Sequence, residues 1–348
     1  PLFSLDLPAT QVADLFGEAH ELVAGPHGRS ICVLDDIDSL RQWTPALAKR
    51  RVHVFEPRPA VRGLSPAPVD YFLAEEAETV VFEVLDASGN VVRRIESSAA
   101  VEQRVKEAND LAEQGIGWRQ PAPPPRKAGV NRYVWDLRYP GATVFDGLIV
   151  WSARPDRGPL AVPGDYRVRV TALGQSATVP YPVRIDPRLE GVSVEDLQAQ
   201  FDLALRIRDR TSDAHEAVLR IRDLKAQMAA RVPLAKSPVI GLAADATARA
   251  LSEVEGELYQ VRNRSSQDPL NFPIKINNRL AALRRSVETG DARPTDAAHA
   301  VFAELSAELD ALLARLRGIE ANQVAAFNRL LENGGLDPVV PAPAAPRP

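Results

Sequence analysis

The sequence predicts a multidomain protein that is built from β-strands in its first half and from α-helices in its second. Three observations predict this order. Apolar residues alternate with polar ones before Pro187 and recur every three or four positions after it. Prolines cluster at 57–68, 121–125 and 338–348, where they are typical of boundaries and tails. The 348 residues are enough for about two or three cores of ordinary size.

The composition excludes several classes of protein. The 42 basic and 46 acidic residues give a net charge of -4, which argues against sequence-independent nucleic-acid binding. No apolar run approaches the roughly 20 residues that a membrane-spanning helix needs, so no transmembrane segment is expected. The single cysteine, Cys32, cannot form an internal disulfide.

Residues 1–56 contain short apolar runs at 11–16, 21–25 and 30–36, and each run has the length of a strand. Together they have the size of one β-propeller blade, and we interpret them as the remnant of a last blade. A sheet this small needs another element to cover its face. The proline-rich residues 57–68 that follow are predicted to be a linker.

Residues 57–188 are predicted to form an immunoglobulin-like antiparallel β-sandwich with a helical insertion at about 98–128. Residues 79–86 and 91–95 flank a turn and predict a hairpin. Further strands are expected at 131–137, 148–151, 164–172, 177–181 and 183–186.

Residues 189–333 are predicted to form an antiparallel four-helix bundle. Ser193 precedes acidic residues, as at a capped helix start, and the apolar positions then step by threes and fours to Met228. Helices are expected at 193–231, 242–263, 273–289 and 295–332. Residues 334–348 are expected to be a disordered Pro/Ala tail.

The chain lacks a recognisable catalytic constellation. The spacing of the histidines is not that of metal ligands. These histidines are His20, His27, His53, His215 and His299. No phosphate-binding glycine motif and no Gly-x-Ser-x-Gly string occurs. We therefore expect no catalytic residue, no metal site and no cofactor.

Asp35 and Asp36, with Asp38 close by, form the densest acidic cluster near a predicted strand end, and Asp136 follows another strand. Such residues could bind calcium or act as a carboxylate pair in glycoside hydrolysis. A strand-to-loop turn whose aspartates bond backbone amides is the favoured interpretation. Trp135 could stack on a sugar, but an inward position in the core is favoured.

The string Arg-Ile-Arg-Asp occurs twice, at 206–209 and at 220–223, two heptads apart on one helix. Both copies therefore lie on the same side of that helix. The favoured interpretation is a salt-bridged flank of the bundle in which each arginine pairs with an aspartate three residues on. The alternative is a partner-binding stripe made by Arg206, Asp209, Arg220 and Asp223.

Specific strings resemble the C-terminal region of large bacterial β-propeller proteins with sortilin-like or neuraminidase-type (Asp-box) repeats, which are commonly labelled glycosyl hydrolases. His-Gly-Arg-Ser-Ile-Cys-Val-Leu-Asp-Asp at 27–36, followed by Leu-Arg-Gln at 40–42, resembles the end of their last blade. Segments 81–95, 129–139 and 163–168 resemble a flagellar hook-cap type immunoglobulin-like module. Segments 186–188, 267–275 and 277–280 resemble their helical C-terminal region.

This resemblance implies the non-catalytic C-terminal part of an exported protein, secreted, periplasmic or attached to the cell envelope. Its partner would be a protein, or a carbohydrate bound by further blades. The start at Pro1, without methionine, is expected for a processed chain or a piece of a longer one. Asp-box strings (Ser-x-Asp-x-Gly-x-x-Trp) do not occur, so no catalytic residue is transferred. A carbohydrate-active enzyme using Asp35, Asp36 or Asp136 remains the alternative, and the oligomeric state stays open.

Overall fold

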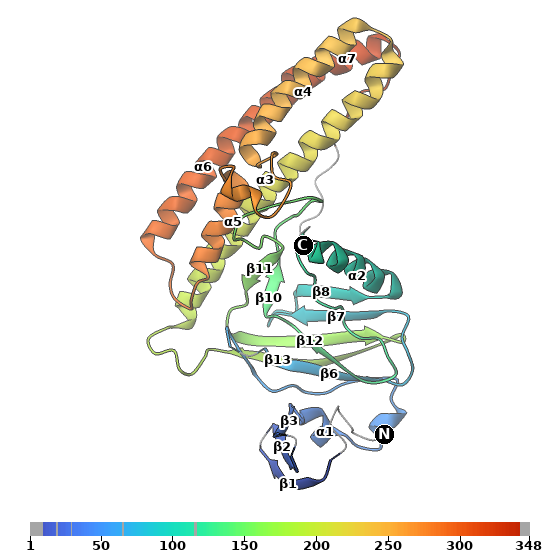
Figure 1. The fold of residues 1–348 in the computed structure, drawn as a ribbon, viewed down its shortest axis with the longest axis vertical. Coiled ribbons are helices and arrows are strands. Elements are labelled where there is room, and N and C mark those ends of the chain that lie inside the picture. The colour runs from blue at the N-terminus through green and yellow to red at the C-terminus, as the bar shows by residue number, and fades with distance from the viewer. Residues whose placement is uncertain (1–9, 19, 29, 65, 115–116, 342–348) are drawn as a thin grey trace. The chain divides into compact units, whose positions relative to one another are not determined.

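The structure, a computed structural model, is mixed β and α, with several sheets and a helical C-terminal region (Figure 1). It describes residues 10–18, 20–28, 30–64, 66–114 and 117–341. The chain divides into two compact units. The first unit comprises residues 1–105, 121–137 and 163–186, and the second comprises 106–120, 138–162 and 187–348.

The first unit begins with a small antiparallel sheet in the order β1 (Val12–Gly17), β2 (Glu21–Pro26) and β3 (Cys32–Asp35). These strands match the three predicted apolar runs. Large apolar side chains on this sheet and beside it face solvent: Leu15 is 61% exposed, Phe16 59% and Ile31 71%. The short helix α1 (Asp38–Gln42) follows.

Two further sheets make the core of the first unit. One has the order β5 (Ala60–Val61), β13 (Gln175–Arg184), β12 (Gly164–Ala172), β7 (Val80–Leu85) and β8 (Val91–Ser97). The other has the order β4 (Val52–Val54), β6 (Pro68–Leu73) and β9 (Gly129–Val134). The sheets meet through side chains, since the rings of Phe82 on β7 and Tyr133 on β9 lie 4.8 Å apart. Trp135 is 1% exposed, as the core interpretation predicted, and its ring contacts Tyr166 and Tyr181.

Three predictions for this β-rich part are wrong. Residues 57–68 are not a free linker, because Ala60 pairs in parallel with Val183 and is fully buried. This segment forms β5, a strand at the edge of its sheet. The nearby prolines are compatible with that position, because only one side of an edge strand has to donate backbone hydrogen bonds. The pair of strands expected at 177–186 is one continuous strand, β13. Residues 148–151 form no strand, because their backbone polar groups bond to helix side chains, such as Asn278 on Trp151.

The helix expected after β8 is present as α2 (Ala99–Glu113), whose residues are divided between the two units. It is shorter than the insertion predicted at about 98–128. Its Asn109 side chain caps the loop that follows, accepting from Gln120 N at 2.6 Å and donating to Gln120 O at 3.1 Å.

The second unit is built on α3 (Val194–Ala235), α4 (Pro238–Leu258), α5 (Ile276–Val287), α6 (Asp296–Ile319) and α7 (Ala325–Asn333). A π-helical turn, Glu320–Val324, joins α6 to α7 in one rod. Figure 1 shows α3, α4 and this rod running alongside one another. The predicted cap at Ser193 is present. It is part of a capping box, because the Ser193 hydroxyl accepts from Asp196 N and the Asp196 carboxylate accepts from Ser193 N.

Residues 138–162 belong to the helical unit and contain the two-stranded sheet of β10 (Arg138–Pro140) and β11 (Arg157–Leu160). We call residues 138–162 the strap. Its Phe145 and Leu148 join the core formed by the helices. Polar helix side chains bind its backbone; for example, Ser212 Oγ accepts a hydrogen bond from Thr143 N at 3.0 Å.

The tail prediction is wrong for its first residues. Val339 is 1% exposed and packs into the helical core. Asn328 accepts from Val339 N at 2.8 Å and donates to Val339 O at 2.9 Å, which makes up for the lack of regular backbone pairing there. Residues 342–348 lie outside the described residues.

Candidate functional site

The repeated Arg-Ile-Arg-Asp strings lie on α3, and their isoleucines, Ile207 and Ile221, are both fully buried. Equal burial confirms that the two copies share one side of the helix, as their spacing predicted. Because each isoleucine points into the core, the arginines on either side of it lie along the two flanks of the helix.

The first arginine of each copy contacts the α6–α7 rod. The guanidinium of Arg206 lies over the ring of Phe302 on α6, with its central carbon 4.8 Å from the ring centroid. Arg220 instead forms an ion pair with Glu320 in the π-helical turn, where Nη2 donates to Oε2 at 3.1 Å. One copy thus makes a cation–π contact and the other a carboxylate pair.

The second arginine of each copy binds the strap. Arg208 Nη1 donates to the carbonyl oxygen of Pro140 at 3.2 Å. Arg222 lies over the ring of Phe145 at 4.7 Å and donates to Glu255 Oε1 at 2.8 Å. The repeat therefore serves two interfaces of α3 at once, with the rod and with the strap.

The expected pairing of each first arginine with its own aspartate is not the observed arrangement. Asp209 accepts two hydrogen bonds from the neighbouring Arg208, at 2.9 and 2.6 Å. Asp223 accepts from Gln227 Nε2 at 2.8 Å. Arg206 and Arg220 contact residues of the α6–α7 rod instead, because pairs on the surface of one helix stabilise by only about 0.2–0.5 kcal/mol each.

A groove of about 560 Å³ lies between α3 and α6 at the first copy, and we call it the flank groove. From α3 it is lined by Arg206, Asp209 and Arg210, and from α6 by His299, Phe302, Ser306 and Asp310. Two members of the predicted stripe, Arg206 and Asp209, are therefore brought together, whereas Arg220 and Asp223 are not among the residues that line it. Phe302, which also lines the groove, is not among the binding residues predicted from the sequence.

Two buried polar atoms at the flank groove lack a hydrogen-bond partner among the described residues. Arg210 donates to Asp213 at 2.7 Å and to Asp310 at 2.5 Å. Its Nε is nevertheless buried without a hydrogen-bond partner among the described residues, and the same holds for Ser306 Oγ. Unpaired buried polar atoms are uncommon in a purely structural seam and call for a specific explanation.

A second polar cluster holds the strap to α3 and α5. His215 is fully buried, its Nδ1 lies 2.5 Å from Thr143 O, and its Nε2 lies 3.0 Å from Asn277 Nδ2. The carbonyl requires a proton on Nδ1, so Nε2 accepts from the amide and the ring is neutral. Burial lowers the pKa of His215 to about 4, which keeps the ring neutral at physiological pH. This histidine is a structural element of the helical unit.

The acidic candidates lie in the first unit. Asp35 and Asp136 are exposed, and Asp36 is buried with a left-handed backbone, φ 58°. Arg132 holds this turn, because it donates to Asp36 O at 2.9 Å and to both carboxylate oxygens of Asp70, at 2.7 and 2.8 Å. The turn is thus tied to the sheet by a guanidinium that bridges its backbone and a buried carboxylate.

The Asp36 carboxylate has a cationic neighbour, but its Oδ2 is buried and accepts no hydrogen bond among the described residues. Its Oδ2 lies 3.4 Å from Arg58 Nε. Burial, and then the nearby charge of Asp38, raise the pKa of Asp36, and Arg58 and Arg132 oppose them. The surroundings of Asp36 are those of an ion-paired residue in a turn, and they differ from those of a catalytic acid that faces a substrate.

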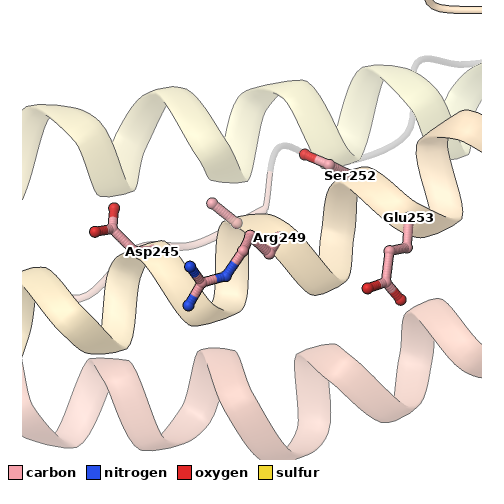
Figure 2. A pocket seen from close by; sticks show the side chains of 5 residues that line it. Asp245, Arg249, Ser252 and Glu253 are labelled. Carbon is pink, nitrogen blue, oxygen red and sulfur yellow. The ribbon is translucent and has the colours of Figure 1, made fainter.

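Another hollow, of about 550 Å³, follows the surface of α4. Figure 2 shows its labelled side chains, Asp245, Arg249, Ser252 and Glu253, coming from that helix. Two of them are already engaged by neighbouring helices. Ser252 accepts from Lys225 at 2.8 Å, and Glu253 pairs with Arg315.

Across the described residues, no group of three or more His, Cys, Asp or Glu side chains is placed to hold a metal ion. The helices of the described chain also include none with the length and apolar character to cross a membrane. The comparisons with known proteins add no assignment: no family model matches the chain, and no curated protein matches it.

Proposed function

We propose that this chain is the non-catalytic C-terminal part of an exported multidomain β-propeller protein, and that its helical unit is a docking module. The flank groove is its binding surface, and an acidic segment of a partner protein is its ligand. The observation that carries this proposal is the placement of Arg206 on Phe302, beside two buried polar atoms without partners.

The exposed guanidinium of Arg206 supports an acidic ligand, whereas the other charged side chains that line the groove are already paired with each other or with neighbours. Asp209 is engaged by Arg208, and Asp310 is engaged by Arg210. Arg206 is exposed and lies on an aromatic ring, so its guanidinium edge can still donate to a carboxylate. An apolar side chain of the ligand would contact Phe302, and an acidic one would pair with Arg206.

Two features support the propeller and immunoglobulin-like assignments. The antiparallel meander β1–β2–β3 exposes Leu15, Phe16 and Ile31, as expected for a blade that is covered by a neighbour. The facing five- and three-stranded sheets, with Trp135 buried between tyrosines, suit an immunoglobulin-like sandwich.

The alternative, a carbohydrate-active enzyme, draws less support from the acids. A glycosidase needs opposed carboxylates about 5–9.5 Å apart that line a cleft. Asp36 is ion-paired in a turn, and none of Asp35, Asp36 and Asp136 lines the flank groove or the α4 hollow.

A selection from a displayed peptide library tests the docking proposal. We expect enrichment of acidic peptides with spaced apolar residues, and we expect amide-exchange protection by the best peptide at residues 206–210 and 299–310. Enriched peptides that lack acidic residues, or protection confined to other helices, would contradict the proposal.

A further inference from the structure

We propose that a further hollow of the helical unit binds a small organic oxyanion, a phosphate or a carboxylate carried on an apolar ring. This hollow, the arginine pocket, has a volume of about 590 Å³ and is separate from the flank groove. Among its lining residues are Trp118, Arg138, Arg154, Arg284, Arg285 and Glu288.

Positive charge exceeds negative charge in the arginine pocket. Glu288 is shared, because it accepts from Arg138 at 3.2 Å and also pairs with Arg284. Arg154 pairs with Asp156, with Nη2 donating to Oδ2 at 2.6 Å. Five arginines line the pocket, against one lining carboxylate, Glu288, and the carboxylate of Asp156 that pairs with Arg154. The excess of guanidinium groups over carboxylates in the lining favours an anionic ligand.

Arg285 is the cation best placed to receive a ligand. It is exposed at the pocket and donates to two neutral acceptors of Ser152, to the carbonyl oxygen at 2.8 Å and to the hydroxyl oxygen. Neutral acceptors leave its charge uncompensated. A phosphate or carboxylate oxygen would exchange a neutral hydrogen bond for a charge-assisted one, which is roughly twice as strong.

The walls of the pocket are rigid. Arg284 is 5% exposed and donates to Arg154 O at 2.7 Å. Glu288 Oε1 accepts from Leu160 N at 2.9 Å, which fixes the carboxylate against the strap. Side chains held in this way do not have to be ordered when a ligand arrives, so little binding energy is lost to ordering them.

Trp118 supplies the apolar wall. The central guanidinium carbon of Arg154 lies 5.7 Å from the ring centroid of Trp118, so a charged and an aromatic surface adjoin. A volume of about 590 Å³ lies within the usual range for small-molecule sites, about 300–1,000 Å³. A ring that bears one anionic group would meet both surfaces.

Calorimetric titration of the full chain at constant ionic strength tests this proposal, with phenyl phosphate, benzoate and phenol as ligands. We expect saturable binding of at least one of the two anions and none of neutral phenol. The stronger anion identifies the chemical source, phosphate or carboxylate. Absence of saturable binding by both anions, or equal binding of phenol, would overturn the proposal.

Substitutions of the lining residues test whether the ligand binds in the arginine pocket. Arg285→Gln is expected to weaken binding about tenfold, the effect of one lost charge-assisted hydrogen bond. Arg317→Gln removes an exposed arginine of α6 that does not line the pocket, and it should leave the affinity within about twofold. Arg154→Gln gives an independent second variant, and Trp118→Phe should remove any ligand-dependent fluorescence change. Wild-type affinity in both Arg285→Gln and Arg154→Gln would overturn the assignment.

Discussion

The guanidinium carbon of Arg206 lies 4.8 Å from the ring centroid of Phe302, and this contact joins α3 to α6 at the flank groove. The equivalent residue two heptads on, Arg220, reaches the same rod but pairs with Glu320. A carboxylate partner neutralises Arg220, whereas the aromatic partner leaves the charge of Arg206 in place. The two copies of the same sequence thus differ: Arg220 links α3 to the rod, and Arg206 keeps the charge that the docking proposal requires.

The stability of the helical unit should fall on acidification because of His215. Its pKa is about 4 in the folded state and 6.5 as a free side chain, so the unfolded state binds the proton more readily. The contribution of His215 is therefore complete above about pH 6.5 and is lost as the pH falls to about 4. The loss amounts to about 3 kcal/mol.

Denaturant unfolding at a series of pH values measures this effect. His215→Gln should flatten the slope between pH 6.5 and about 4, whatever its effect on absolute stability. His299→Gln, which replaces an exposed histidine of α6, should keep the wild-type slope. An unchanged slope in His215→Gln would show that other groups cause the pH dependence.

Two adjacent valines test the docking of the chain after α7. Val339 is 1% exposed and Val340 is 62% exposed. Val339→Ala should lower the unfolding free energy by about 2 kcal/mol, because buried methyl groups are lost, and Val340→Ala should have little effect. Equal effects in chemical denaturation would mean that this segment does not belong to the core.

Two glycines of the helical unit should respond to alanine in opposite directions. A Cβ at Gly158 would overlap the carbonyl oxygens of Tyr139 and Pro140, where β10 and β11 meet, whereas a Cβ at Gly318 in α6 meets open space. Gly158→Ala should destabilise by at least about 2 kcal/mol through overpacking. Gly318→Ala should stabilise by about 0.5–1 kcal/mol through helix propensity. Thermal unfolding followed by circular dichroism distinguishes them, and a neutral Gly158→Ala would refute the close approach of the two strands.

The β1–β3 sheet should be the first part of the chain to be digested. All six residues of β1 are exposed, and the sheet has only three short strands. Limited proteolysis with a non-specific protease, followed by intact-mass analysis, should remove residues up to about 36 before any cut in α3–α7. Protection of this sheet equal to that of the helices would contradict the interpretation as an uncovered blade.

The sequence was most informative where its pattern is local. The steps from Leu197 to Met228 predicted α3, and the spacing of the repeat predicted that Ile207 and Ile221 share a face. The strap could not be predicted in this way. Its partners are far away in the chain, as Asn278 is from Trp151, and no periodicity records a side chain that bonds a distant backbone.

The binding surfaces were predicted only in part. The repeat marked Arg206 and Asp209, but the partner of Arg206 depends on which α6 residue lies opposite, Phe302 or a carboxylate. The arginine pocket gave no sequence signal, because Arg138, Arg154 and Arg284 come together only when the strap folds onto α5.

A charge exchange at Arg206 tests the docking account most directly. Fluorescence anisotropy would measure the affinity of the best selected acidic peptide for the wild-type chain and for Arg206→Glu. It would then be repeated with a peptide in which the acidic residue that pairs with Arg206 is replaced by lysine. We expect about tenfold weaker binding for Arg206→Glu and substantial recovery with the lysine peptide, while Arg317→Glu behaves as wild type. Equal affinity of wild type and Arg206→Glu for the acidic peptide would contradict it.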